Sequence, residues 1–195
     1  MIQKLSLVVL IVSCMALSAC GMRSIPLAEN QVEASWADVQ NQYKRRADLV
    51  PNLVAVVKGY ATHERETLEA VVNASAKATQ TQVNFSELNE QKMKQFSQAQ
   101  GELSSSLSRL LVSVEKYPDL KANENFKDLQ AQLEGTENRI TVARNRYIES
   151  IKEFNNEITV PPTSWYNSLF LHKNKMPQFA VENLQKVENA PEVKF

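Results

Sequence analysis

The chain has 195 residues, and its 22 lysines and arginines match its 22 aspartates and glutamates. This balance of charge argues against binding to nucleic acid, which calls for a basic patch or stripe, and against electrostatic binding to anionic lipid. Both cysteines, Cys14 and Cys20, lie near the N-terminus. The rest of the sequence therefore provides no disulfide, no thiol nucleophile and no cysteine-ligated metal site.

The N-terminal residues have the pattern of a secretory signal. Lys4 is followed by an apolar stretch from Leu5 to about Ala16, which is shorter than the roughly 20 residues of a membrane-spanning helix. We therefore predict a signal peptide over residues 1–19. An uncleaved N-terminal membrane anchor is the alternative.

The run LSACG at residues 17–21 resembles the lipobox of bacterial lipoproteins. The resemblance implies cleavage before Cys20, a diacylglycerol on its thiol and acylation of the new amino terminus, and two or more acyl chains anchor a protein stably. We expect a membrane-anchored extracytoplasmic lipoprotein on the periplasmic side, with a lipidated tether at residues 20–26. Gly21 stands where an aspartate usually retains such proteins in the inner membrane, so the outer membrane is slightly favoured.

The next segment has the period of an amphipathic helix that begins near Leu27. Its apolar stripe consists of Val32, Trp36, Val39, Tyr43, Val50, Leu53, Val57, Tyr60, Leu68 and Val71. Pro51 has no backbone donor and costs ~3 kcal/mol or more inside a helix. We therefore predict a kink or restart at Pro51, with Asp48 as a candidate cap for the second half.

Two further stripes follow a polar segment, residues 79–87, which we predict to be a loop. The second stripe is Phe96, Gln100, Leu103, Leu107, Leu110, Val114 and Tyr117, and the third is Phe126, Leu129, Leu133, Thr136, Ile140, Ala143, Tyr147, Ile151, Phe154 and Ile158. Pro118 is predicted to end the second helix, with residues 118–122 as a connection. Asn123 and Thr163 are predicted to cap the helices that they precede.

Helices that are apolar on one face can bury that face only against one another. The sequence therefore predicts an all-α fold, an antiparallel up-and-down bundle over residues 27–172. It would contain three long helices, the first kinked at Pro51, and a short C-terminal helix after Pro161 and Pro162. Residues 173–195 are predicted to form an extended tail.

Three blocks of sequence resemble the LemA family. They are residues 44–64, with KRRADLVPNLV at their start, residues 115–130, with EKYPDLKAN, and residues 136–147, with TENRI. The ending VKF at 193–195 is similar too. The resemblance implies an all-helical bundle displayed outside the cytoplasmic membrane, and the family has no established activity. Its members usually begin with an uncleaved membrane helix, whereas this chain has the lipobox-like run.

Charged residues interrupt the first stripe at Arg46 and Glu64, which together with Asp48 and Asn52 form a polar constellation. A buried charge is costly unless it is paired. The third helix offers three partners, Glu137, Arg139 and Arg144. We favour an internal ion-pair network that fixes the helix register over a ligand site.

The sequence gives no catalytic constellation. His63 and Glu64 suggest a zinc protease motif, but Thr67 stands where the second histidine is needed. The chain has neither a glycine-rich phosphate loop nor a nucleophile elbow. We therefore expect no enzyme activity, no metal and no cofactor.

A group of apolar side chains near the C-terminus is the best candidate for an interaction face. It consists of Trp165, Tyr166, Leu169 and Phe170, which could dock a partner or touch the lipid interface. Closure of the open seam of the bundle is the alternative. The expected function is a lipid-anchored, non-enzymatic interaction or scaffold module of the cell envelope, with an envelope or membrane protein as partner. A structural homo-oligomer and an envelope hydrolase remain as alternatives.

Overall fold

The computed structural model describes residues 2–61 and 63–179, with the backbone alone for residues 2–21. Most of the described residues are helical, and none of them forms a strand. In chain order the elements are α1 (Ile2–Tyr60), α2 (Arg65–Gln80), the 3-10 turn η1 (Phe85–Glu87), α3 (Glu90–Val114), α4 (Pro118–Ala122), α5 (Glu124–Thr159), α6 (Thr163–Tyr166) and the π-helical turn η2 (Asn167–Leu171).

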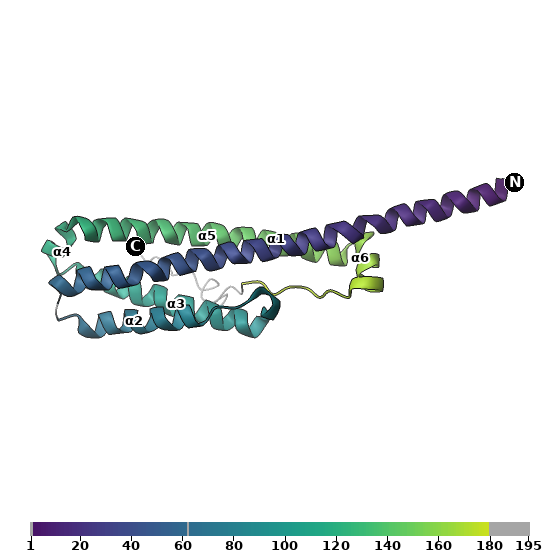
Figure 1. Cartoon of the computed structure of the whole chain (residues 1–195). Coiled ribbons are helices and arrows are strands. Elements are labelled where there is room, and N and C mark those ends of the chain that lie inside the picture. The colour runs from purple at the N-terminus through teal and green to yellow at the C-terminus, as the bar shows by residue number, and fades with distance from the viewer. Residues whose placement is uncertain (1, 62, 180–195) are drawn as a thin grey trace, which may run out of the picture.

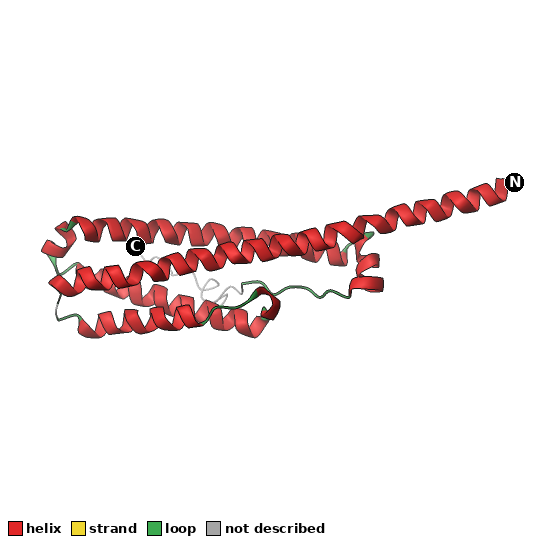
Figure 2. Ribbon diagram, viewed as in Figure 1, coloured by secondary structure: helices red, strands yellow, loops and turns green. Residues whose placement is uncertain are grey.

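The helices α1, α2, α3 and α5 run alternately up and down (Figure 1). The predicted all-α antiparallel bundle is therefore confirmed, although it has four long helices rather than three. The helices α1 and α5 pack side by side and extend past the shorter α2 and α3 (Figure 2). The N-terminal part of α1 projects beyond the bundle, and α6 lies beside α1 at that same end.

The first long helix ends at Tyr60 and not at Pro51, so the predicted restart at Pro51 is wrong. α1 continues through Pro51 because Pro51 is exposed while its neighbours Val50 and Leu53 are buried in the core. Packing on the inner face thus offsets the missing hydrogen bond on the outer face. Asp48 accordingly caps nothing and binds Lys44 Nζ at 2.7 Å.

The predicted stripes form the core almost without exception. Every member of the third stripe is buried, and in the first two stripes only Tyr60 and Tyr117 are not. Asn123 caps α5 as predicted, since its Oδ1 accepts from the Phe126 amide at 3.0 Å. Thr163 is not a cap, because its hydroxyl donates to the Glu157 carbonyl at the end of α5 (2.6 Å).

The connection between α3 and α5 is partly helical. α3 already ends at Val114, and Pro118 begins the single turn α4 over the predicted connection. Proline is tolerated at the first helical position, where its missing amide would have had no partner.

The core consists of two apolar clusters along the bundle axis. One is built around Val50, Leu53, Leu103, Leu110 and Phe126, near the turn between α1 and α2. The other, built around Ile25, Trp36, Phe96, Tyr147 and Phe154, fills the end from which α1 projects. Buried polar residues on three helices lie between them: Arg46, Gln100 and Thr136.

Both ends of the bundle differ from the predicted bounds, residues 27–172. Ile25 is fully buried, so core packing begins before Leu27, within the predicted tether. Residues 173–179 have no regular structure, but Phe179 is buried with its ring 5.5 Å from that of Tyr147. The remaining predicted tail, 180–195, lies outside the described residues.

Candidate functional site

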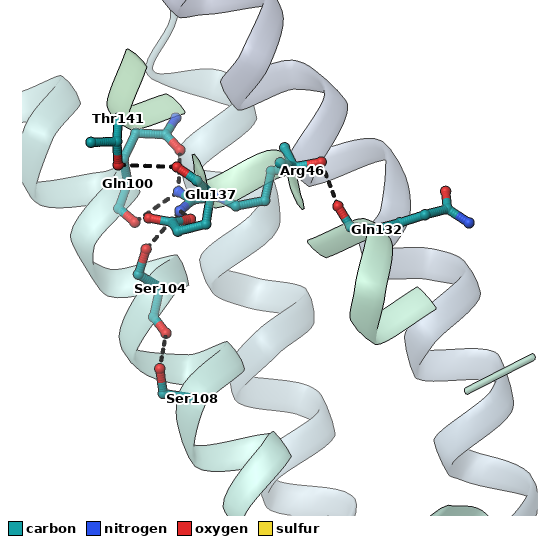
Figure 3. A network of polar contacts seen from close by, with 8 residues as sticks. Arg46, Gln100, Ser104, Ser108, Gln132, Glu137 and Thr141 are labelled. Carbon is teal, nitrogen blue, oxygen red and sulfur yellow. Dashed lines mark hydrogen bonds and ion pairs between the residues drawn. The ribbon is translucent and has the colours of Figure 1, made fainter. Parts of the chain in front are cut away.

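A buried arginine lies at the centre of the polar layer between the two clusters. The Arg46 side chain, on α1, is only 2% exposed. Its Nη1 donates to Ser104 Oγ (2.6 Å) and to Glu137 Oε2 (3.0 Å). Its Nη2 donates to the main-chain oxygen (3.0 Å) and to Oε1 (2.8 Å) of Gln100. One guanidinium thus joins α1, α3 and α5 (Figure 3).

The ion pair in this layer is asymmetric, because the Glu137 side chain is 55% exposed. Water solvates its carboxylate, so the pair resembles a surface salt bridge in strength. The buried partners of Arg46 are the neutral acceptors of Gln100, whose Nε2 in turn donates to the Ala78 carbonyl of α2 at 3.3 Å. The guanidinium also lies over the Tyr43 ring, 5.0 Å from its centroid. Within the described residues Arg46 Nε has no hydrogen-bond partner.

The structure brings together only part of the predicted polar constellation. Arg46 and Glu137 meet as expected, whereas Asp48, Asn52 and Arg139 are exposed and lie outside the layer. Helix geometry explains the first two, because residues two and six positions after Arg46 point to the opposite side of α1. An amphipathic helix turns such residues toward water.

Glu64 also lies outside the polar layer. It is located in the turn between α1 and α2, where its Oε1 accepts from the Tyr117 hydroxyl at 3.3 Å. The predicted stripe placed Glu64 inside the bundle because the apolar period continues past it to Leu68 and Val71.

A cavity of about 410 Å³ borders the polar layer, between α1, α3, α5 and the segment that ends at Phe179. Arg144, the remaining predicted partner, lines this cavity with its guanidinium 4.5 Å from the centroid of the Phe179 ring. Burial raises the pKa of the Tyr43 phenol in the cavity wall, while the positive charges of Arg144 and Arg46 act in the opposite direction. Tyr43 is therefore a neutral hydrogen-bonding group and not a base at neutral pH.

Three residues of this region were missed at the level of sequence: Gln100, Ser104 and Phe179. Gln100 had a signal, since it is a polar residue within an apolar stripe on α3, like Arg46 on α1. Ser104 follows one helical turn later and shares the same face. Phe179 had no such signal in the sequence, because it belongs to no segment with a helical apolar period.

The side chains of the described residues provide no metal centre. No group of three histidine, cysteine, aspartate or glutamate side chains gathers there in a way that could hold a metal ion. His63 is exposed in the turn after α1. Both terminal nitrogens of the Arg46 guanidinium are engaged by the protein itself, so this part of the layer has the properties of a structural network.

The predicted interaction face is largely open to solvent. Trp165, Leu169 and Phe170 are 60%, 69% and 66% exposed, whereas Tyr166 packs partly on the cluster around Trp36. Only Tyr166 thus serves to close the seam of the bundle. The binding role of the other three side chains stays a prediction.

Comparison with known proteins gives a family but no characterised relative. The sequence model of the LemA family matches residues 35–195, which covers all the blocks that carry the resemblance. No curated protein matches the chain. Among the helices of the described residues, none combines the length and the apolar character that crossing a membrane requires.

Proposed function

The chain belongs to the LemA family, and from that premise we propose that it is a lipid-anchored, non-enzymatic module of the cell envelope. In this proposal the lipid is attached to Cys20, on the periplasmic side, with the outer membrane favoured over the inner. The bundle serves as a rigid scaffold that presents its surface to an envelope or membrane protein.

One observation carries the proposal. The large exposed side chains Trp165, Leu169 and Phe170 lie at the end of the bundle that leads to the N-terminal segment. Ser24 Oγ donates to Glu157 Oε2 at 2.7 Å, which ties the start of the bundle to the end of α5 just before these residues. Exposed apolar side chains that gather at one place mark interaction sites in soluble domains.

Two further facts agree with a non-enzymatic role. The LemA family has no known enzymatic activity. The most polar buried group, Arg46, is held by Gln100, Ser104 and Glu137, and so it stabilises the contact between helices.

The anchor is tested by metabolic labelling of cells that express the full chain with a fatty-acid analogue. We expect the label on the wild-type chain and none on Cys20→Ser, while Cys14→Ser, the matched control, keeps it. Equal labelling of Cys20→Ser and the wild type would exclude Cys20 as the lipid site.

The partner is tested by in-cell crosslinking of the full chain followed by mass spectrometry. We expect one envelope or membrane protein to be enriched with the wild type and depleted with Cys20→Ser, because the unanchored chain no longer concentrates at the membrane. Recovery of abundant background proteins alone, or of the chain itself alone, would contradict the scaffold proposal. The second outcome would favour a homo-oligomer.

A further inference from the structure

The described surface has an uneven distribution of exposed apolar side chains. Four are scattered singly along the bundle: Tyr60, Val72, Val112 and Val142. The others lie on α1, at the end of α5, on α6 and on η2, around the end from which α1 projects: Met22, Leu27, Val160, Trp165, Leu169 and Phe170. We call this second group the apolar end.

Polar contacts fix the position of the apolar end along the axis of α1. Beside the bond from Ser24 to Glu157, Lys173 Nζ, just after η2, pairs with Glu29 Oε1 at 2.7 Å. Asn167 is buried and binds the main chain on both sides of the turn, with the Lys173 amide donating to its Oδ1 at 2.9 Å. α6 and η2 are thus fastened to the α1 segment between residues 24 and 29.

This segment of α1 lies close to the proposed lipid. Ile25, the first described core residue, is five positions after Cys20, which is ~7.5 Å along a helix. The headgroup layer on each side of a bilayer is about 5–8 Å thick, half the difference between a total of about 40–45 Å and a core of about 30 Å. Residues 24–29 lie ~6–14 Å beyond Cys20 along α1, so a lipid attached at Cys20 would bring the near edge of the apolar end to the headgroup layer.

We propose that the apolar end inserts into the headgroup region of the bilayer, so that Trp165, Leu169 and Phe170 form a second membrane contact beside the lipid. This inference rests on the proposed anchor. It assigns the lipid surface, not the protein partner, to this face, so the proposed protein partner would bind the remaining surface of the bundle. Tryptophan suits that depth because its ring is apolar while its N–H finds a partner among headgroups and water. A second contact would hold the bundle in one orientation, since a single flexible attachment leaves it free to tilt.

The attraction is apolar rather than electrostatic. The charged side chains at this end have both signs: Lys173 pairs with Glu29, and Arg23 adjoins Ser24, which donates to the Glu157 carboxylate. We therefore expect contact with zwitterionic lipid and little dependence on salt.

The two tryptophans of the chain allow a direct test, because Trp36 is 1% exposed in the core and Trp165 is 60% exposed. The full chain is reconstituted into phosphatidylcholine vesicles with and without brominated acyl chains. Trp36→Phe reports on Trp165, and Trp165→Phe is the matched control that reports on Trp36. We expect a blue shift of Trp165 emission on reconstitution and loss of most of it in brominated lipid, with Trp36 unchanged.

Two results would overturn the inference. In the first, iodide in the buffer quenches Trp165 fluorescence and brominated lipid does not, which would place Trp165 in water. In the second, neither quencher acts on Trp165, which would mean that protein covers it. If Trp36→Phe fails to fold, the difference between the wild type and Trp165→Phe gives the Trp165 signal. Mass spectrometry of the same samples shows whether Cys20 carries lipid, so failure of the anchor and failure of the insertion are separate outcomes.

Discussion

Replacement of Arg46 by methionine tests whether the polar layer stabilises the bundle. Methionine keeps an unbranched apolar stem of similar length but removes every donor of the guanidinium. Gln100 Oε1, which is buried, then loses the bond of 2.8 Å that it accepts from Arg46. The half-buried Ser104 hydroxyl and the half-exposed Glu137 carboxylate each lose a partner as well.

The free energy of unfolding should fall by about 2–4 kcal/mol. An unsatisfied buried acceptor costs about 1–3 kcal/mol, the bond to Ser104 is worth about 1 kcal/mol, and an ion pair with a half-exposed acid adds about 0–1 kcal/mol. Removal of a desolvated charge offsets part of this sum. For a domain of this size, each kcal/mol lost lowers the melting temperature by about 2–4 °C. The melting temperature should therefore fall by about 5–15 °C.

The assay is urea unfolding of residues 21–195, followed by circular dichroism. Lys44→Met is the matched control, because Lys44 is on the same helix and pairs with Asp48 while both are exposed. It should change stability by less than about 0.5 kcal/mol. Glu137→Gln should cost no more than about 1 kcal/mol.

A double-mutant cycle identifies the residue that loses its partner. Gln100→Met in the Arg46→Met background removes the stranded acceptor, so the double variant should be more stable than the sum of the single effects by about 1–3 kcal/mol. Additive effects, or a loss in Glu137→Gln as large as in Arg46→Met, would refute this account of the layer.

Three further predictions use the same unfolding assay. Asn123→Ala should lower the free energy of unfolding by about 1 kcal/mol, because the Phe126 amide loses its cap; an unchanged midpoint would contradict the cap. Trp165→Ser combined with Phe170→Ser should cost less than about 0.5 kcal/mol, since both side chains are exposed, and loss of helicity would place them in the core instead. Burial raises the pKa of the Tyr147 phenol above 10.0, so above about pH 10 the unfolded chain loses this proton first and stability falls by up to about 1.4 kcal/mol per pH unit. Tyr147→Phe should show a shallower alkaline loss than the wild type, and equal slopes would refute it.

The apolar period of the sequence was enough to predict most of the core. Val32, Trp36, Leu103 and Ile151 are buried as their stripes predicted. The helix period identifies the apolar face of each helix, and the hydrophobic effect removes that face from water. The same reasoning placed Arg46 inside the bundle and named Glu137 among its partners. It also gave the cap at Asn123, which depends on contacts within one turn.

Other features depended on contacts between segments distant in sequence. Propensity predicted a break at Pro51, yet burial of Val50 and Leu53 against other helices outweighs the lost hydrogen bond, and α1 ends at Tyr60 instead. The principal buried partner of Arg46 is Gln100, which lies 54 positions away. Phe179 enters the second cluster from a segment without periodicity. The sequence by itself thus determined which faces of the helices are apolar, since this is a local property of a periodic chain. Only the tertiary structure decided where the first helix ends and which side chains meet, because these depend on the summed free energy of packing across the whole bundle.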